Sequence, residues 1–155
     1  MVDLSDLVGP ERIIANLKAS SKKQVLEELA KRAGQITRLS EESILNTLLE
    51  RERLGSTGLG QGIAIPHGKL AGLGGVFGLF ARLENPVDFD AVDNEPVDLV
   101  FLLLAPEGGS ADHLKALARV SRLLRNTQIC SRLRAGETVA ELAKVLAEKE
   151  TSHAA

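Results

Sequence analysis

The sequence has little of three features that would place it in a special class of proteins: cysteine, charge of one sign and long apolar runs. Cys130 is the single cysteine among 155 residues, so no internal disulfide can form and a reduced, cytoplasmic setting fits best. The 19 basic residues are balanced by 21 acidic ones, which gives a net charge of −2. Nucleic-acid binders usually carry a clear basic excess, so we expect no nucleic acid as a partner.

Apolar runs are short. The longest, such as Leu99–Ala105, fall far below the ~20 residues that a membrane-spanning helix needs. The N-terminus carries Asp3 and Asp6 and lacks the basic-then-apolar layout of a signal peptide. We therefore expect a soluble protein with no direct membrane insertion.

The length and composition favour one globular domain. A domain usually has roughly 100–200 residues, so residues 1–155 are predicted to form one domain. With 44% hydrophobic and 26% charged residues the chain is not disordered, and it is long enough to need no disulfide or metal for stability. We expect an ordered core over about 5–148 and a frayed C-terminal tail.

Helical spacing and capping signatures predict several helices. Ser21 with Gln24 forms a capping-box signature before a helix that runs to Gly34, and a second helix starts at Ser40 and ends near Leu54. A third helix opens with Ser110 as its cap, and Thr138 with Glu141 precedes a last one. The buried face predicted for the third helix consists of Leu114, Leu117, Ala118, Ser121 and Leu124.

Strands are predicted between and before these helices. Ile13 to Leu17 forms a short first strand, and longer runs follow at 76–83 and 97–105. The last run is apolar at nearly every position, which is typical of a central strand covered on both faces. Because helices fall at both ends and between strands, we predict an α/β fold with a mixed sheet flanked by helices on both sides.

His67 is the first candidate for chemistry. It follows Pro66 at the end of the strand-like run Ile63–Ile65, after the glycine-rich segment Gly55-Ser-Thr-Gly-Leu-Gly-Gln-Gly62. Ligands favour strand ends in open α/β sheets, glycines let backbone N–H groups approach a bound group, and histidine changes charge near neutral pH. On context alone, the more common interpretation is that His67 is merely a turn residue.

His113 and Arg51 are further candidates. With Ser110 as cap, His113 is the third residue of its helix, near the positive end of the helix dipole, where an anion is favoured. Arg51 precedes the glycine-rich segment, and its guanidinium is a natural partner for phosphate. The competing interpretations are a surface histidine and an exposed charge run, Glu50-Arg51-Glu52-Arg53.

Spacing excludes other sites. The Walker A pattern before Gly68-Lys69 fails at Ile63 and Leu70, the dinucleotide fingerprint lacks its third glycine, and no close His or Cys pair suggests zinc. The acidic residues Asp88, Asp90, Asp93 and Glu95 fit a solvated turn better than an EF-hand. Cys130 is predicted to be a small core residue.

These residues carry a family resemblance. Arg51-Glu52 followed by Gly55-Ser-Thr-Gly-Leu-Gly-Gln-Gly-Ile-Ala-Ile-Pro-His67-Gly-Lys69 resembles the signature of enzyme IIA components of the bacterial phosphotransferase system, in the mannitol/fructose class and most closely its nitrogen-regulatory branch. Asn94-Glu-Pro-Val-Asp-Leu-Val-Phe101 and Asp112-His113-Leu114 resemble later motifs of that family. The resemblance covers essentially the whole chain.

The resemblance implies a phosphohistidine intermediate. Matched position by position, His67 is the histidine that becomes phosphorylated on Nε2, and His113 and Arg51 stabilise the phosphate. An HPr-like phosphocarrier is the implied donor, with enzyme I and phosphoenolpyruvate upstream. No metal or organic cofactor is expected, because the phosphate arrives already activated on another histidine.

Three functions remain open at this stage. The first is a regulatory switch whose targets are of the potassium-transport or sensor-kinase type, which the absence of a fused IIB or membrane IIC segment favours. The second is a transport component that passes phosphate from His67 to a separate IIB protein for fructose or mannitol uptake. The third is a binding module that never turns over phosphate.

Two further groups of residues are expected at the site. Backbone amides of 56–62 are expected to add hydrogen-bond donors to the phosphate. Leu59, Ile65 and Phe77 are expected to form the apolar rim on which a carrier docks.

Overall fold

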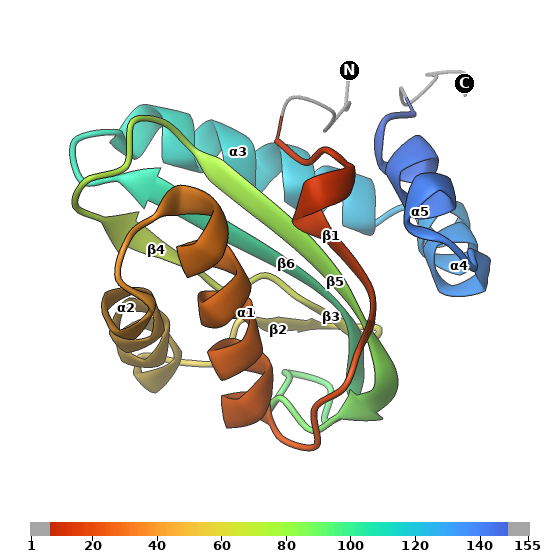
Figure 1. Cartoon of the computed structure of the whole chain (residues 1–155). Coiled ribbons are helices and arrows are strands. Elements are labelled where there is room, and N and C mark those ends of the chain that lie inside the picture. Colours follow the sequence, from red (N-terminus) through yellow and green to blue (C-terminus); the bar gives the residue numbers. More distant parts are fainter. Residues whose placement is uncertain (1–6, 149–155) are drawn as a thin grey trace.

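The computed structural model describes residues 7–148, without the side chain of Ser110. A mixed six-stranded sheet has helices against both of its faces, as predicted (Figure 1). The frayed tail expected at the C-terminus, with His153, lies outside the described residues, as do Asp3 and Asp6. No helix within residues 7–148 has the length and apolar character to cross a membrane. In chain order the elements are η1 (Pro10–Arg12), β1 (Ile13–Leu17), α1 (Lys22–Thr37), α2 (Glu41–Arg53), β2 (Gly58–Gly60), β3 (Ile63–Ala64), β4 (His67–Leu70), β5 (Phe77–Val87), β6 (Val97–Pro106), α3 (Ser110–Leu124), α4 (Thr127–Ala135) and α5 (Val139–Leu146).

The sheet is built around β6. Its strand order is β1-β5-β6-β3-β2, and β4 also pairs with β6. One side of β6 pairs antiparallel with β5, whereas β3 and β4 both pair parallel with it, one after the other. The chain therefore leaves β6 briefly between Ala64 and His67, and this break in pairing lies at the middle of the sheet.

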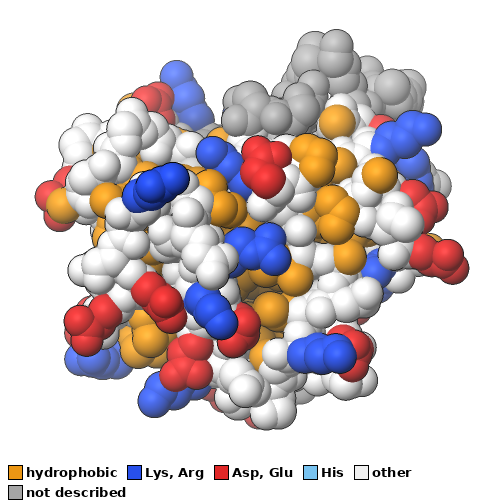
Figure 2. Space-filling model, in the orientation of Figure 1, with side chains coloured by type: hydrophobic (Ala, Val, Ile, Leu, Met, Phe, Trp, Pro, Cys, Tyr) orange, Lys and Arg blue, Asp and Glu red, His pale blue; other side chains and the backbone are white. Residues whose placement is uncertain are grey.

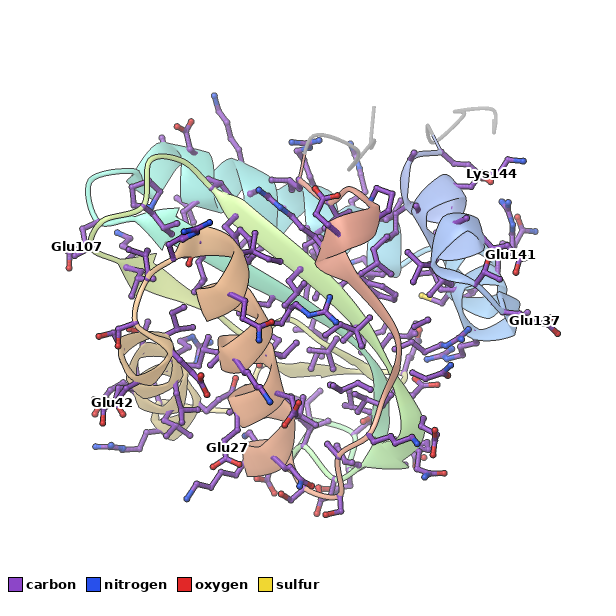
Figure 3. The ribbon with its side chains drawn as sticks, in the orientation of Figure 1. Glu27, Glu42, Glu107, Glu137, Glu141 and Lys144 are labelled. Carbon is purple, nitrogen blue, oxygen red and sulfur yellow. The ribbon has the colours of Figure 1, made fainter. Side chains whose placement is uncertain are left out.

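Two hydrophobic cores cover the two faces of the sheet. Successive residues of β6 alternate between them, because side chains of a strand point to opposite faces. Leu99, Phe101 and Leu103 pack with α3, α4 and α5. Val100, Leu102 and Leu104 pack with α1 and α2. Charged side chains such as Glu27, Glu42, Glu141 and Lys144 lie at the periphery, while apolar side chains fill the space between the layers (Figure 3).

The predicted element boundaries hold with small changes. The side chains of Ser21, Ser40 and Thr138 cap their helices, and the capping box of Thr138 with Glu141 is complete. The first helix does not stop at Gly34 but continues to Thr37 and ends at Arg38, which adopts the left-handed conformation at φ 66°. Gly34 lies inside the helix, and its carbonyl accepts a hydrogen bond from the N–H of Arg38 at 2.9 Å, which closes the last turn.

The predicted buried face of α3 is only partly correct, because Leu117 packs against the core but two other residues do not. Leu114 is 68% exposed and Ala118 is exposed, whereas Leu124 is buried as expected. The residues that α3 directs toward the sheet are shifted by about one position from the predicted ones. A shift of one residue corresponds to a rotation of about 100° around the helix axis. The stripe directed toward the sheet consists of His113, Ala116, Val120, Leu123 and Leu124.

Charges of both signs are mixed on the surface seen in Figure 2, which shows no broad field of either sign on that face. This mixture agrees with the net charge of −2.

Candidate functional site

His67 begins β4 rather than ending a strand, which corrects the prediction. β3 ends at Ala64, and His67 is the first residue to pair again with β6, opposite Leu103. Pro66 spans the break, and its carbonyl accepts a hydrogen bond from the Leu103 N–H at 3.0 Å. His67 is only partly buried, so it is not closed off within the core.

A backbone carbonyl fixes the tautomer of His67. The Nδ1 atom lies 2.7 Å from the carbonyl oxygen of Ile65. A carbonyl can only accept, so Nδ1 carries the proton and donates it, which leaves the lone pair of the neutral ring on Nε2. His67 therefore presents Nε2 as a nucleophile or hydrogen-bond acceptor.

Arg51 donates to that same atom. Its Nε lies 3.3 Å from His67 Nε2, and its Nη1 donates to the carbonyl of Gly55 at 2.9 Å. Close packing between α2 and β4 makes this contact possible. A Cβ on Gly68 would lie 2.5 Å from Thr47 Cγ2, so only glycine lets the helix approach this closely. Thr47 is one helical turn before Arg51, which places the guanidinium beside His67.

His113 completes a group of three. The rings of His67 and His113 meet edge to face, with centroids 5.6 Å apart and planes at 87°. His113 is 7% exposed, and its Nε2 is buried without a hydrogen-bond partner among the described residues. Leaving a buried polar atom unsatisfied costs roughly 1–3 kcal/mol, so this atom suggests a site that a ligand completes.

The position of His113 in α3 differs slightly from the prediction. The N-cap is Gly109, with no side-chain cap hydrogen bond, and His113 is the fourth helical residue. Its own N–H is already bonded to the Gly109 carbonyl at 2.9 Å. The side chain, and not this backbone donor, is the group that faces the site.

Burial keeps both rings neutral. Desolvation lowers the pKa of His67 below its ordinary value, and the nearby Arg51 charge lowers it too, while the Ile65 carbonyl and Glu52 oppose this. Desolvation also lowers the pKa of His113, and its electrostatic interactions with the neighbouring His67 and Lys69 lower it further. At neutral pH His67 is therefore uncharged, with its Nε2 lone pair available.

The four charged residues 50–53 behave in two different ways. Arg53 and Glu50 form the exposed, self-compensated pair that sequence reasoning anticipated, 2.9 Å apart. Arg51 and Glu52 instead turn inward. The side chain of Glu52 is 6% exposed and pairs with Lys22 at 2.9 Å. Its burial was missed, because alternating charges on a helix are typical of a solvated face.

Three backbone amides of the glycine-rich segment already donate hydrogen bonds within the protein. The N–H of Thr57 donates to Glu52 at 3.1 Å, that of Gly58 to Ser56 Oγ at 2.9 Å, and that of Gln61 to Asp93 at 2.9 Å. Gly58–Gly60 of the segment form β2, which pairs with β3. The expectation that amides of 56–62 surround a phosphate is therefore wrong for these three.

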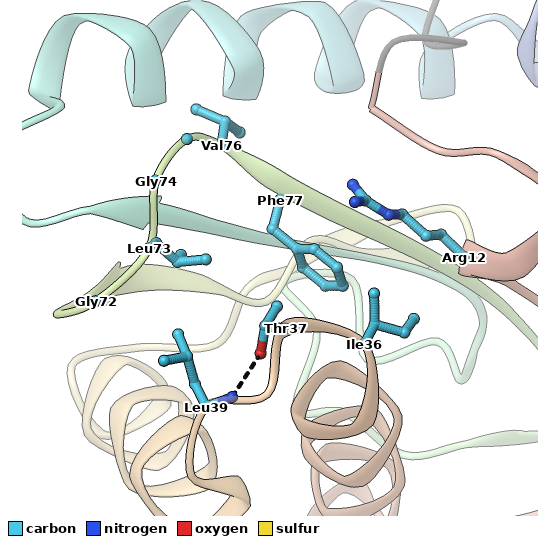
Figure 4. Close-up of a pocket in the computed structure, with 10 residues that line it drawn as sticks. Arg12, Ile36, Thr37, Leu39, Gly72, Leu73, Gly74, Val76 and Phe77 are labelled. Atoms are coloured by element: carbon cyan, nitrogen blue, oxygen red, sulfur yellow. Dashed lines mark hydrogen bonds between the residues drawn. The ribbon is translucent and has the colours of Figure 1, made fainter.

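Two of the three residues expected on the docking rim lie in the core. Ile65 and Phe77 are 4% and 3% exposed, whereas Leu59 is exposed. Phe77 lies under the guanidinium of Arg12, whose carbon is 4.7 Å from the ring centroid, and both line a cavity of about 240 Å³ beside the end of α1 (Figure 4). Neither His67 nor Arg51 lines that cavity.

Two further sequence predictions, the acidic turn and the buried cysteine, are confirmed. Asp93 accepts from the N–H groups of Gln61 and Glu95, as expected of a turn, and Asn94 adopts a left-handed conformation at φ 59°. Cys130 is buried, its Sγ lies 3.2 Å from the Leu124 carbonyl, and burial raises the pKa of its thiol. It is a core residue, and its environment does not favour a reactive thiolate.

The fold is found in solved phosphotransferase proteins. It matches the nitrogen regulatory protein IIA-Ntr from Neisseria meningitidis with a TM-score of 0.87 and 36% identity, over 92% of this chain and 98% of that one. It also matches IIA mannitol from Escherichia coli with a TM-score of 0.77, over 90% and 99% of the two chains. At 23% identity the second match shows the fold alone.

The chain belongs to the family described as phosphoenolpyruvate-dependent sugar phosphotransferase system, EIIA 2, which matches residues 6–149. It is 56% identical to a nitrogen regulatory protein of Bradyrhizobium diazoefficiens, over 93% of this chain and 94% of that protein. It is 40% identical to the nitrogen regulatory protein of Escherichia coli strain K12, over 96% and 92%. The family expected from the sequence is therefore confirmed.

Proposed function

We propose that this chain is a nitrogen-regulatory enzyme IIA protein that accepts a phosphoryl group on His67 Nε2 from an HPr-like phosphocarrier. The observation that carries this proposal is the hydrogen bond from His67 Nδ1 to the Ile65 carbonyl at 2.7 Å. It leaves the lone pair of a neutral ring on the one nitrogen that Arg51 also faces.

The transfer step is a displacement at phosphorus. The Nε2 lone pair of His67 forms a bond to the phosphorus atom while the bond from phosphorus to the donor's histidine nitrogen breaks, and its electron pair returns to that nitrogen. Nδ1 keeps its proton throughout, so no base is needed in this step. Such transfers depend on positioning and on charge stabilisation at the equatorial oxygens.

Arg51 and His113 supply that stabilisation in the proposed mechanism. The guanidinium of Arg51 already lies at His67 Nε2. The buried Nε2 of His113 has no hydrogen-bond partner within residues 7–148, and a phosphoryl oxygen would provide one. Donors fixed in advance in a partly dry site stabilise developing charge with little reorganisation. The exposed side chains of Leu54, Leu59 and Leu114 offer apolar surface for a carrier.

Sequence identity to the relatives favours a regulatory role. Relatives called nitrogen regulatory protein match nearly end to end, at 56% in one case, whereas a fructose-specific EIIABC component of Bacillus subtilis is 33% identical and matches over 21% of its own length. We infer that the two phosphorylation states bind regulatory proteins differently, with targets of the potassium-transport or sensor-kinase type. The alternative is delivery to a IIB component, since a fructose-specific EIIA component of Haloferax volcanii is also 34% identical over 96% of this chain.

The test is phosphorylation by the donor system. We expect mass spectrometry after incubation with phosphoenolpyruvate, enzyme I and phosphocarrier to show one added phosphoryl group that is base-stable and acid-labile. His67→Ala should abolish the gain, and His153→Ala should keep it. Labelling of His67→Ala at the level of the unchanged protein would refute the assignment. Adding purified IIB proteins separates the two roles, because a regulatory protein should yield no sugar phosphate.

A further inference from the structure

Glu52 is a buried carboxylate that no step of the proposed transfer uses. Its Oε1 pairs with Lys22 Nζ at 2.9 Å and accepts from the Thr57 N–H at 3.1 Å, while its Oε2 accepts from the Thr57 hydroxyl. A buried charge is costly unless it is paired and hydrogen-bonded, and here Lys22 supplies the pairing and Thr57 the hydrogen bonds.

A path of hydrogen bonds leads from Glu52 to His67. Thr57 is fixed by Glu52 through its N–H and its hydroxyl, and its carbonyl accepts from the Ile65 N–H at 3.1 Å. The carbonyl of Ile65 is the group that accepts from His67 Nδ1 at 2.7 Å. The position of the group that selects the His67 tautomer therefore depends on where Glu52 holds Thr57.

Glu52 is also adjacent to Arg51, on the other side of the site. It follows Arg51 at the end of α2, where the chain turns sharply: the N–H of Leu54 bonds to the Arg51 carbonyl and that of Gly55 to the Glu52 carbonyl, both at 3.1 Å. Arg51 Nη1 binds the Gly55 carbonyl. Two consecutive side chains thus hold the two ends of the loop 55–57, one from each side.

Lys22 strengthens this arrangement from α1. Besides its ion pair with Glu52, its Nζ lies 5.1 Å from the centroid of the Phe89 ring. The Phe89 carbonyl accepts from Ser56 Oγ at 2.6 Å, which gives the loop a second attachment. The first turn of α1 is therefore joined to the loop by two separate sets of contacts.

We propose that Glu52, held by Lys22 and Thr57, is a positioning residue that orients the His67 ring through Thr57 and Ile65 and keeps Arg51 turned toward it. This inference rests on the phosphohistidine function proposed above and adds a residue to it. At metal sites, mutating a residue that orients a ligand histidine typically lowers affinity or activity by about 10–100-fold.

The direct test compares Glu52→Ala with Glu50→Ala. Glu50 is an exposed neighbour on the same helix that pairs with Arg53. Long-range nitrogen–proton NMR of the unphosphorylated protein, at a pH above the pKa of His67, reads the tautomer of the ring. We expect a single Nδ1–H tautomer in the unchanged protein and in Glu50→Ala, and a mixture in Glu52→Ala with phosphoryl acceptance slowed at least about tenfold.

Glu52→Gln tests rescue and guards against loss of folding. Its side-chain oxygen can still accept from the Thr57 N–H, so we expect the single tautomer to return and the rate to lie between those of the unchanged protein and Glu52→Ala. Because the Glu52 charge raises the pKa of His67, this variant should titrate His67 at lower pH than Glu50→Gln does. If Glu52→Ala does not fold, this comparison decides the matter.

The inference is overturned if Glu52→Ala matches Glu50→Ala in tautomer and rate, or if Glu52→Gln matches Glu50→Gln in rate and in the titration of His67. Failure of the proposed function looks different. In that case the unchanged protein takes up no phosphate, or His67→Ala still does, whereas the tautomer measurement needs no phosphorylation at all.

Discussion

Arg51 donates its Nε–H to His67 Nε2 across 3.3 Å, so in the unphosphorylated protein the guanidinium occupies the side of the ring where a phosphoryl group would be attached. In the proposed mechanism, that nitrogen forms a bond to phosphorus, and its lone pair is then no longer available to Arg51. The Nε–H must then turn to a phosphoryl oxygen, a short movement for a side chain that is also held by the Gly55 carbonyl. The two states of the site thus share one arginine with different partners.

Arg51→Gln and Arg51→Lys should both slow acceptance of phosphate by about 10²-fold, the usual effect of removing one fixed donor from a developing anion. Lysine is not expected to restore the rate, because an ammonium lacks the planar fork that can serve Gly55 and the phosphoryl group together. The measurement is the single-turnover rate from pre-phosphorylated carrier. Arg53→Gln is the matched control, and a lysine variant as fast as this control would contradict the role of the fork.

His113→Ala should slow the same reaction by about 10²-fold and leave residual acceptance, because His67 and Arg51 remain in place. His113→Gln keeps a side-chain donor and should fall between alanine and histidine. Quench-flow rates with pre-phosphorylated carrier give the comparison, with Ala118→Ser, an exposed change on the same helix, as control. Equal rates for His113→Ala and the control would show that the unpartnered Nε2 of His113 does not serve the phosphate.

The sequence predicted the β6 strand and the site histidines for different reasons. β6 follows from an unbroken apolar run, which a strand buried on both faces requires. The roles of His67, His113 and Arg51 came from a motif resemblance, since spacing alone left a turn residue and a surface residue open for the two histidines. The structure brings the three side chains together from β4, α3 and α2.

Other features could not be predicted because two patterns competed. In α3, the stripes that begin at His113 and at Leu114 are both spaced as a helix face, and a histidine counts as polar, so periodicity favoured the wrong one. The burial of Glu52 could not be predicted either, because its ion-pair partner Lys22 is thirty positions away in α1. Ile65 and Phe77 were assigned to a docking rim, yet both sit where strands meet the core.

Acidification should reveal the lowered pKa of His67. Desolvation and Arg51 shift the pKa below 6.5, so phosphoryl acceptance should persist as the pH falls past the usual imidazole range and decline only when Nε2 becomes protonated. An NMR titration of the His67 ring and the pH dependence of the transfer rate should give the same midpoint. Arg51→Gln removes a neighbouring positive charge and should move that midpoint upward. A midpoint above 6.5 in the unchanged protein would contradict the desolvation argument.

The same shift has a consequence for stability. Below an unfolded pKa of about 6.5 the unfolded chain binds a proton that the folded His67 does not yet bind. The contribution of this residue to the free energy of unfolding is therefore fully present above that pH and declines as the pH falls toward the folded pKa. His113 has the same sign. Urea unfolding from pH 8 to pH 5 should show a weaker pH dependence for His67→Gln than for the unchanged protein.

Gly68→Ala tests whether the close contact between α2 and β4 sets the distance between Arg51 and His67. The added Cβ would lie 2.5 Å from Thr47 Cγ2, and the β-branched threonine has little freedom to turn away. The helix must shift, taking Arg51 with it. We expect a loss of about 1–3 kcal/mol in the free energy of unfolding, as for other overpacked sites, together with slower phosphoryl acceptance.

Thr47→Ser removes the methyl group that the new Cβ would meet, so the double variant Gly68→Ala/Thr47→Ser should recover both stability and rate relative to Gly68→Ala. Residues in contact show such coupling, whereas independent sites add. Chemical denaturation gives the stability cycle and single-turnover transfer gives the rate cycle. If the two changes add in both, glycine at position 68 does not control the approach of α2, and the position of Arg51 depends on the loop 55–57 alone.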